Sequence, residues 1–220
     1  MFISYTIEKI DDDAHEWFAA QCVDPEDEEQ SAAVTSVFVS DTAASETTVL
    51  PAWIPPPVSW LKCNVGIDWS CRRPLMGCSW VLRDDQGTVL LHSRNAIPNI
   101  RDRDAASFKG TVWAVENLVS HGISKVILEL EDSTLVGCVL RPKAWPSFRC
   151  EAFELLRVLE GLQNWKVDVV DRKANRGAHL IAQSVYEGYR VRSYVAFSHL
   201  FWLDEVFASE KVVSSVVKTC

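Results

Sequence analysis

The sequence predicts an α/β fold with one mixed five-stranded sheet and helices on both faces. Two observations lead to this prediction. Three strand-like stretches follow one another between residues 60 and 96, and strands then alternate with helices to about residue 189. Successive hairpin strands favour antiparallel pairing, whereas strand–helix–strand connections favour parallel neighbours, so a mixed sheet is expected.

The first three strands are predicted from alternating apolar residues and a turn. Residues 60–69, WLKCNVGIDW, place Leu61, Cys63, Val65 and Ile67 on one face of a strand. Residues 75–84 and 88–96 also have strand character, and the DQG turn at 85–87 joins them as a hairpin. An antiparallel meander is therefore expected.

The second half of the chain alternates helices with short strands. A helix is predicted over 104–122, where apolar residues recur with a period of 3.6 before His121 and Gly122 end the pattern. The remaining elements are strands at 124–130 and 166–173, and helices at 132–141, 147–165 and 175–189. The final apolar stretch, 194–210, is predicted to be a terminal helix.

Charge and composition divide the chain into three parts. Residues 1–50 hold twelve acids and one Lys, and they combine a short amphipathic helical pattern with a flexible Ser-, Thr- and Ala-rich linker. A Pro-rich entry follows, so we predict a domain at 51–190 and a C-terminal extension packing on it at 191–220. Residues 51–220 carry 21 basic and 18 acidic residues, a balance compatible with nucleic-acid binding.

The sequence also disfavours several classes of protein. No apolar run approaches the length of a membrane span, and the N-terminus has no basic region followed by a sustained apolar one. We therefore expect a nuclear or cytoplasmic protein that is not secreted and has no membrane partner. The seven Cys include no CxxC pair, which disfavours a structural zinc site.

Five short motifs, in this order, resemble the RNase H type 1 domain, and more narrowly the plant version found in non-LTR retroelement polyproteins. They are PPPVSWLKCNV at 55–65, VLRDDQGTVLLHS at 81–93, WAVENL at 113–118, VILELEDSTLV at 126–136 and DRKANRGAHLIAQSV at 171–185. No single motif is specific to this family, but the order and spacing of all five over about residues 53–188 are specific to it. The resemblance implies a retroelement-derived protein whose active relatives cleave the RNA strand of an RNA–DNA hybrid with Mg²⁺.

The family's chemistry needs four carboxylates around two Mg²⁺ ions, from the first strand, the first helix, the end of the fourth strand and the last helix. At the matching positions this chain has Gly66, Ser107, Glu131 or Asp132, and His179. Because one carboxylate of four remains, the resemblance implies that ribonuclease activity is lost. No resident cofactor is expected, and at most weak Mg²⁺ binding at Glu131 or Asp132.

Some of these residues allow alternative interpretations. Asp68 and Asp104 are displaced acids that could rebuild a metal site, or they are solvated surface acids. Asp132 is either a metal ligand or the N-cap of the helix that follows it. For His179 we expect an exposed or half-buried place on a helix rather than a catalytic or zinc-binding one.

Basic and amide residues beside the lost site favour nucleic-acid binding. Lys173, Asn175 and Arg176 lie at the start of the last family helix, where a phosphate group is favoured. We therefore predict a pseudoenzyme that binds an RNA–DNA hybrid or RNA. The alternatives are a protein-interaction module that binds a protein partner and no nucleic acid, and a residual hybrid ribonuclease that uses the displaced carboxylates.

Overall fold

The computed structural model of the protein describes residues 53–217, with side chains placed through Glu210. Apart from Ser70–Arg72, these residues belong to one compact unit. The acidic segment 1–50, for which a helix and a flexible linker are predicted, lies outside the described residues. Within the described part, no helix is long and apolar enough to cross a membrane.

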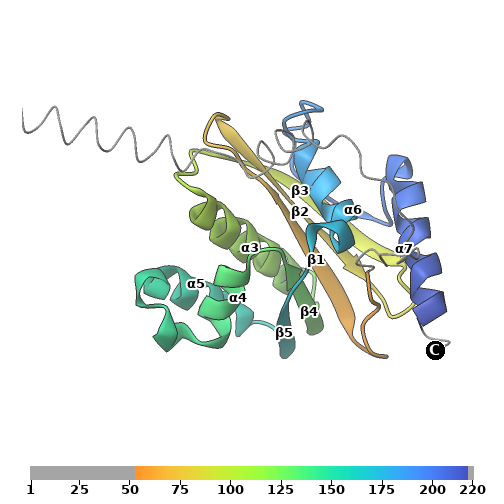
Figure 1. Cartoon of the computed structure of the whole chain (residues 1–220), viewed down its shortest axis with the longest axis horizontal. Coiled ribbons are helices and arrows are strands. Elements are labelled where there is room, and N and C mark those ends of the chain that lie inside the picture. The colour runs from red at the N-terminus through yellow and green to blue at the C-terminus, as the bar shows by residue number, and fades with distance from the viewer. Residues whose placement is uncertain (1–52, 218–220) are drawn as a thin grey trace, which may run out of the picture. The chain divides into compact units, whose positions relative to one another are not determined.

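A mixed sheet with the strand order β5-β4-β1-β2-β3-β6 forms the centre of the fold (Figure 1). Its strands are β1 (Leu61–Asp68), β2 (Leu75–Arg83), β3 (Val89–Pro98), β4 (Lys125–Leu130), β5 (Asn164–Val169) and β6 (Tyr194–Phe197). Pairs β1–β2, β2–β3 and β3–β6 are antiparallel, whereas β4 is parallel to both β1 and β5. The predicted mixed α/β fold and antiparallel meander are confirmed.

The sheet has six strands, so the prediction of five was wrong by one. Tyr194–Phe197, which the sequence assigns to a terminal helix, instead pairs with β3. Its residues alternate between half-buried and exposed, which is the period of a strand. The outer edge of β3 has backbone N–H and C=O groups that need hydrogen-bond partners. Residues 194–197 supply these partners as a strand, which a helix at the same place would not do.

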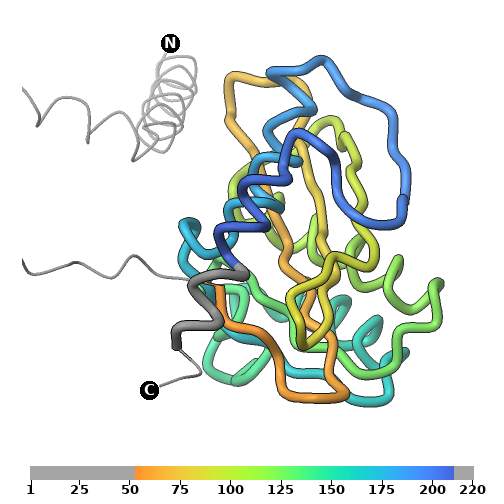
Figure 2. The backbone as a smooth tube through the Cα atoms, turned by 90° about the vertical axis from the view of Figure 1, so that its right-hand side faces the viewer, coloured from red at the N-terminus to blue at the C-terminus, as the bar shows by residue number. Residues whose placement is uncertain are grey.

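Helices cover both faces of the sheet (Figures 1 and 2). One face carries α3 (Arg103–Ser120), α4 (Ser133–Leu140) and α5 (Arg149–Leu159), and the other carries α6 (Arg176–Gln183) and α7 (Asp204–Val217). Short 3₁₀ turns lie at Pro142–Ala144, Pro146–Phe148, Arg172–Ala174 and Phe201–Leu203. Helix α5 ends earlier than predicted because Asn164 and Trp165 pair with β4 as part of β5; α6 gives way to turns after Gln183.

The larger apolar core lies between the sheet and helices α3 and α5. There Val65 and Trp80 of the sheet pack with Val115 and Leu118 of α3 and Leu155 of α5. Each such side chain contributes about 1.5–3 kcal/mol when it is fully buried. A smaller cluster on the opposite face joins β2 and β3 to α6 and α7, so both helix layers are held by apolar contact.

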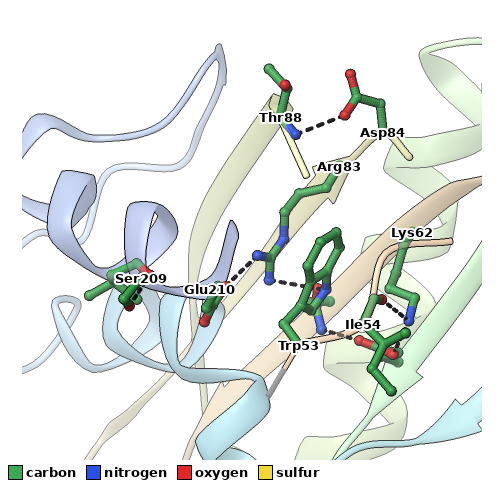
Figure 3. Close-up of polar contacts among 11 residues, drawn as sticks. Trp53, Ile54, Lys62, Arg83, Asp84, Thr88, Ser209 and Glu210 are labelled. Atoms are coloured by element: carbon green, nitrogen blue, oxygen red, sulfur yellow. Dashed lines mark hydrogen bonds and ion pairs between the residues drawn. The ribbon is translucent and has the colours of Figure 1, made fainter. Parts of the chain in front are cut away.

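A buried polar network lies on the α7 face of the sheet (Figure 3). The Arg83 guanidinium donates hydrogen bonds to the Glu210 carboxylate on α7 and, at 3.0 Å, to Asn64 Oδ1. It also lies over the Trp53 ring, 4.0 Å from the ring centroid. Asn64 Nδ2 donates to Glu129 Oε2 at 2.7 Å. The network therefore joins the entry segment, three strands and α7.

Charges in this network are balanced by pairs. Lys62 Nζ lies 2.5 Å from Glu129 Oε1 and forms one ion pair. Arg83 and Glu210 form the other. Burial raises the pKa of Glu210 even though Arg83 opposes the shift, and burial lowers the pKa of Arg83. Buried charges are tolerated when each has a hydrogen-bonded opposite partner, so removing one member of a pair leaves a costly charge behind.

Replacing Glu210 by Ala should lower the free energy of unfolding by about 3–5 kcal/mol, because Arg83 then stays buried without its carboxylate. The double variant Arg83→Met with Glu210→Leu should recover most of this loss, since no buried charge of the pair remains. Urea denaturation measures both changes. Glu205→Ala, at an exposed position on the same helix, is the control and should cost less than about 1 kcal/mol. Equal losses at positions 205 and 210 would contradict the prediction.

Candidate functional site

Gly66, which the resemblance predicts to replace the family's first carboxylate, lies where helix α6 touches the sheet. A Cβ added to Gly66 would lie 2.5 Å from the carbonyl carbon and oxygen of Ala178, and 2.8 Å from the backbone nitrogen of His179. On the neighbouring strand, Ser79 Oγ donates to the same Ala178 carbonyl at 2.5 Å. Because helix backbone fills the space above Gly66, no side chain fits there without moving α6.

Glu131 follows β4 and lies beside β1, where it is held by an amide and a cation of the chain itself. Its carboxylate accepts from Asn175 Nδ2 at 2.7 Å and from Arg172 Nε at 3.1 Å. Asn175 Nδ2 also donates to the Val65 carbonyl at 2.8 Å. Asn175 thus ties the start of α6 to both strands, and Arg172 supplies the positive charge that a metal ion supplies in a carboxylate site.

Asp132, the other candidate for the strand-end carboxylate, is the N-cap of α4. Its Oδ1 accepts a hydrogen bond from the backbone nitrogen of Leu135 at 3.0 Å. Asp104 belongs to the first turn of α3; partial burial, together with the negative charges of Asp132 and Asp102, raises its pKa. Asp104 and Asp132 are therefore close enough to repel one another.

Asp68 and Ser107, the other positions predicted for the site, have different surroundings. Asp68 forms an ion pair with Arg73 at 2.7 Å. Ser107 is buried on α3, the helix that covers the opposite face of the sheet from α6. Among the residues whose side chains are described, no group of three or more His, Cys, Asp or Glu is arranged to hold a metal ion.

His179 is buried, with 8% of its surface exposed, where the sequence suggested an exposed or half-buried histidine. The reason is the close approach of α6 to β1, because the backbone nitrogen of His179 lies directly against Gly66. Periodicity within α6 does not reveal how near the helix lies to the sheet. This expectation about His179 was therefore wrong.

Three exposed cations, Arg172, Lys173 and Arg176, lie in the turn before α6 and at its first residue, and they form what we call the basic rim; of these, Arg172 contacts Glu131. Asn175, predicted together with Lys173 and Arg176 to contact a phosphate, is fully buried behind this surface and its amide nitrogen is used by Glu131 and Val65. Sequence reasoning did not identify Arg172 as the partner of Glu131; its place in the DRKANRG motif was the available signal.

Comparisons with known proteins agree with this architecture. Residues 64–185 match the family model described as reverse transcriptase-like. RNase H1 from the halophilic archaeon Halobacterium salinarum is 17% identical with a TM-score of 0.52, and the match covers 58% of this chain and 98% of that one. LC11-RNase H1, solved in complex with an RNA/DNA hybrid, is 14% identical with a TM-score of 0.51, covering 59% and 98%. None of the curated proteins matches.

The family match begins within β1 and ends just after α6, so it contains each position of the site described above. At identities below 20% the solved structures establish a common fold and no more. The family model, in contrast, spans more than half of the chain. The chain therefore belongs to the reverse transcriptase-like family, whose domain here has an RNase H-like fold.

Proposed function

We propose that this RNase H-like domain binds nucleic acid, an RNA–DNA hybrid or RNA, without hydrolysing it. The observation that carries the proposal is the contact between α6 and Gly66, which leaves no room for a carboxylate on the first strand. Two-metal hydrolysis needs carboxylates that bridge both ions. A plant retroelement origin is part of the proposal and is supported by the order of the five sequence motifs.

Nucleic acid is the proposed ligand because of the basic rim. Arg172, Lys173 and Arg176 are exposed at the start of α6, and Arg172 contacts Glu131. Exposed Arg and Lys side chains supply most phosphate contacts in nucleic-acid complexes, and such contacts do not depend on metal ions. The structural similarity to LC11-RNase H1, which was solved with an RNA/DNA hybrid, supports the ligand class.

A protein-interaction module is the second candidate function, and one observation favours it. Strand β6 is the last strand at its end of the described sheet, and Phe197 and Phe201 are 86% and 84% exposed. Large apolar side chains next to a strand edge are typical of docking surfaces. Salt-dependent binding of a hybrid distinguishes the first function from the second.

The full chain should bind a labelled RNA–DNA hybrid with an affinity that falls as salt rises, and should not cleave it in Mg²⁺ or Mn²⁺. Lys173→Gln and Arg176→Gln should each reduce the slope of log affinity against log salt by about one unit, because each removes one phosphate contact. Fluorescence anisotropy over a salt series measures the slopes. Arg157→Gln, at an exposed position on α5, is the control and should leave the slope unchanged.

Two results would count against this prediction. If binding is insensitive to salt, or if both rim variants leave the slope of log affinity against log salt unchanged, the protein-interaction module becomes the favoured function. Cleavage that Glu131→Ala abolishes would instead show that the displaced carboxylates form a working site.

Restoring the family's first carboxylate should unfold the protein rather than activate it. Gly66→Asp places a side chain against the Ala178 carbonyl, so we expect a loss of about 3 kcal/mol or more in unfolding free energy and no cleavage of a hybrid. Gly122→Asn is the matched control: an added Cβ there meets nothing within 4 Å and the φ of 71° suits Asn. A stable, cleaving Gly66→Asp variant would refute the steric argument.

A further inference from the structure

Arg94 of β3 is a buried cation that forms no ion pair with a carboxylate among the described side chains. It is 7% exposed, and its terminal nitrogens donate to Ser184 Oγ at 3.1 Å and to the Arg192 carbonyl at 3.5 Å. Burial lowers the pKa of Arg94, and the neighbouring Arg190 guanidinium acts in the same direction. Because a buried charge is retained at a cost unless it has an opposite partner, Arg94 points to an anion.

Unused hydrogen-bonding capacity is found on Arg94 itself, on Tyr194 beside it, and on Trp202, which is linked to Arg94 through Arg190. The buried Arg94 Nε, Tyr194 hydroxyl and Trp202 Nε1 have no hydrogen-bond partner in the described part of the chain. Arg94 lies over the Tyr194 ring, 4.9 Å from its centroid, and Arg190 lies 5.7 Å from the Trp202 centroid. Buried donors normally have acceptors, so this cluster fits a ligand with several acceptor oxygens.

The segment between α6 and β6, drawn in Figure 2 as a blue loop, carries an exposed aromatic residue next to Arg190 in the sequence. Tyr189 is 90% exposed, and its φ of 51° lies in the left-handed region that bulky residues rarely adopt. It directly precedes Arg190, which is also exposed. An exposed ring beside arginines is the arrangement by which proteins stack a base and hold its phosphate.

We propose that Arg94, Arg190, Tyr194, Trp202 and Tyr189, together the Arg94 site, bind one nucleotide of a single-stranded nucleic acid. Arg94 and Arg190 hold the phosphate, with the Tyr194 hydroxyl and the Trp202 indole as further donors, and Tyr189 stacks on the base. A phosphate offers more acceptor oxygens than a carboxylate. A nucleotide also has a base that can stack on the exposed Tyr189 ring, whereas a carboxylate has none.

This inference rests on the proposed nucleic-acid function but uses a different surface. The Arg94 site draws on β3, the segment leading into β6, β6 itself and the turn at Phe201–Leu203, whereas the basic rim follows β5 and begins α6. Neither Glu131 nor the basic rim belongs to it. The two surfaces can therefore be disabled separately.

Thermal unfolding of the full chain in phosphate and in chloride, at equal ionic strength, tests the site. Phosphate should raise the Tm of the unaltered protein above its value in chloride. Arg94→Met should raise the Tm in chloride, because it removes an unpaired buried charge, and should abolish the phosphate effect. Ser184 keeps a partner in this variant, since its hydroxyl also donates to the Ile181 carbonyl at 2.7 Å.

Anisotropy with a short labelled single-stranded oligonucleotide gives the second measurement. Arg94→Met and the exposed Arg190→Gln should each weaken binding about tenfold, the loss expected for one charge-assisted hydrogen bond. Tyr189→Ala should weaken oligonucleotide binding and leave the phosphate effect on Tm unchanged. Arg157→Gln on the opposite helix layer is the control and should change neither.

Several outcomes would overturn the assignment. If Arg94→Met lowers the Tm in chloride while phosphate shifts both proteins equally, Arg94 is structural. If a peptide with the chain's own acidic sequence DPEDEE, residues 24–29, stabilises the protein as much as phosphate and displaces the oligonucleotide, the site takes carboxylates. If the unaltered protein binds the hybrid but its Tm does not rise in phosphate, the Arg94 site is refuted and the proposed function stands. If the unaltered protein binds no hybrid at all, the proposed function itself is refuted.

Discussion

Helix α6 meets the sheet backbone to backbone at Gly66 and Gly77, and much of the fold depends on this contact. Asn175 fixes the start of α6 against β1, and Gly177 leaves space for the Phe207 ring of α7. The glycines of the sheet therefore set the depth of α6, and the glycine of α6 sets the approach of α7. The same close packing leaves no space for a side chain at Gly66, the predicted position of the family's first carboxylate.

Charge on this face of the sheet is neutralised mostly by the protein's own side chains. Glu131 is paired with Arg172, and Glu210 on α7 is paired with Arg83. These internal ion pairs stabilise the fold without a bound metal ion. Arg94 is the exception, and its missing partner is the reason to look for a ligand there.

The C-terminal extension is a structural part of this domain although it lies outside the family match. Strand β6 completes the sheet beside β3, and α7 covers Arg83 through Glu210. The segment that leads into β6 carries Tyr189 and Arg190, two residues of the proposed Arg94 site. The residues that follow the family match therefore stabilise the domain, and they supply most residues of the proposed Arg94 site.

The mixed α/β fold and the meander could be predicted from the sequence alone, because local periodicity and turn signals carry that information. That Gly66, Ser107 and His179 stand at the family's carboxylate positions remains a prediction from motif order. Only the tertiary structure decided that Asp132 caps α4 while Glu131 meets Arg172, and that 194–197 is a strand. It also decided how closely α6 approaches Gly66. These outcomes depend on contacts between residues far apart in the chain, and such contacts leave no periodic trace in the sequence around either partner.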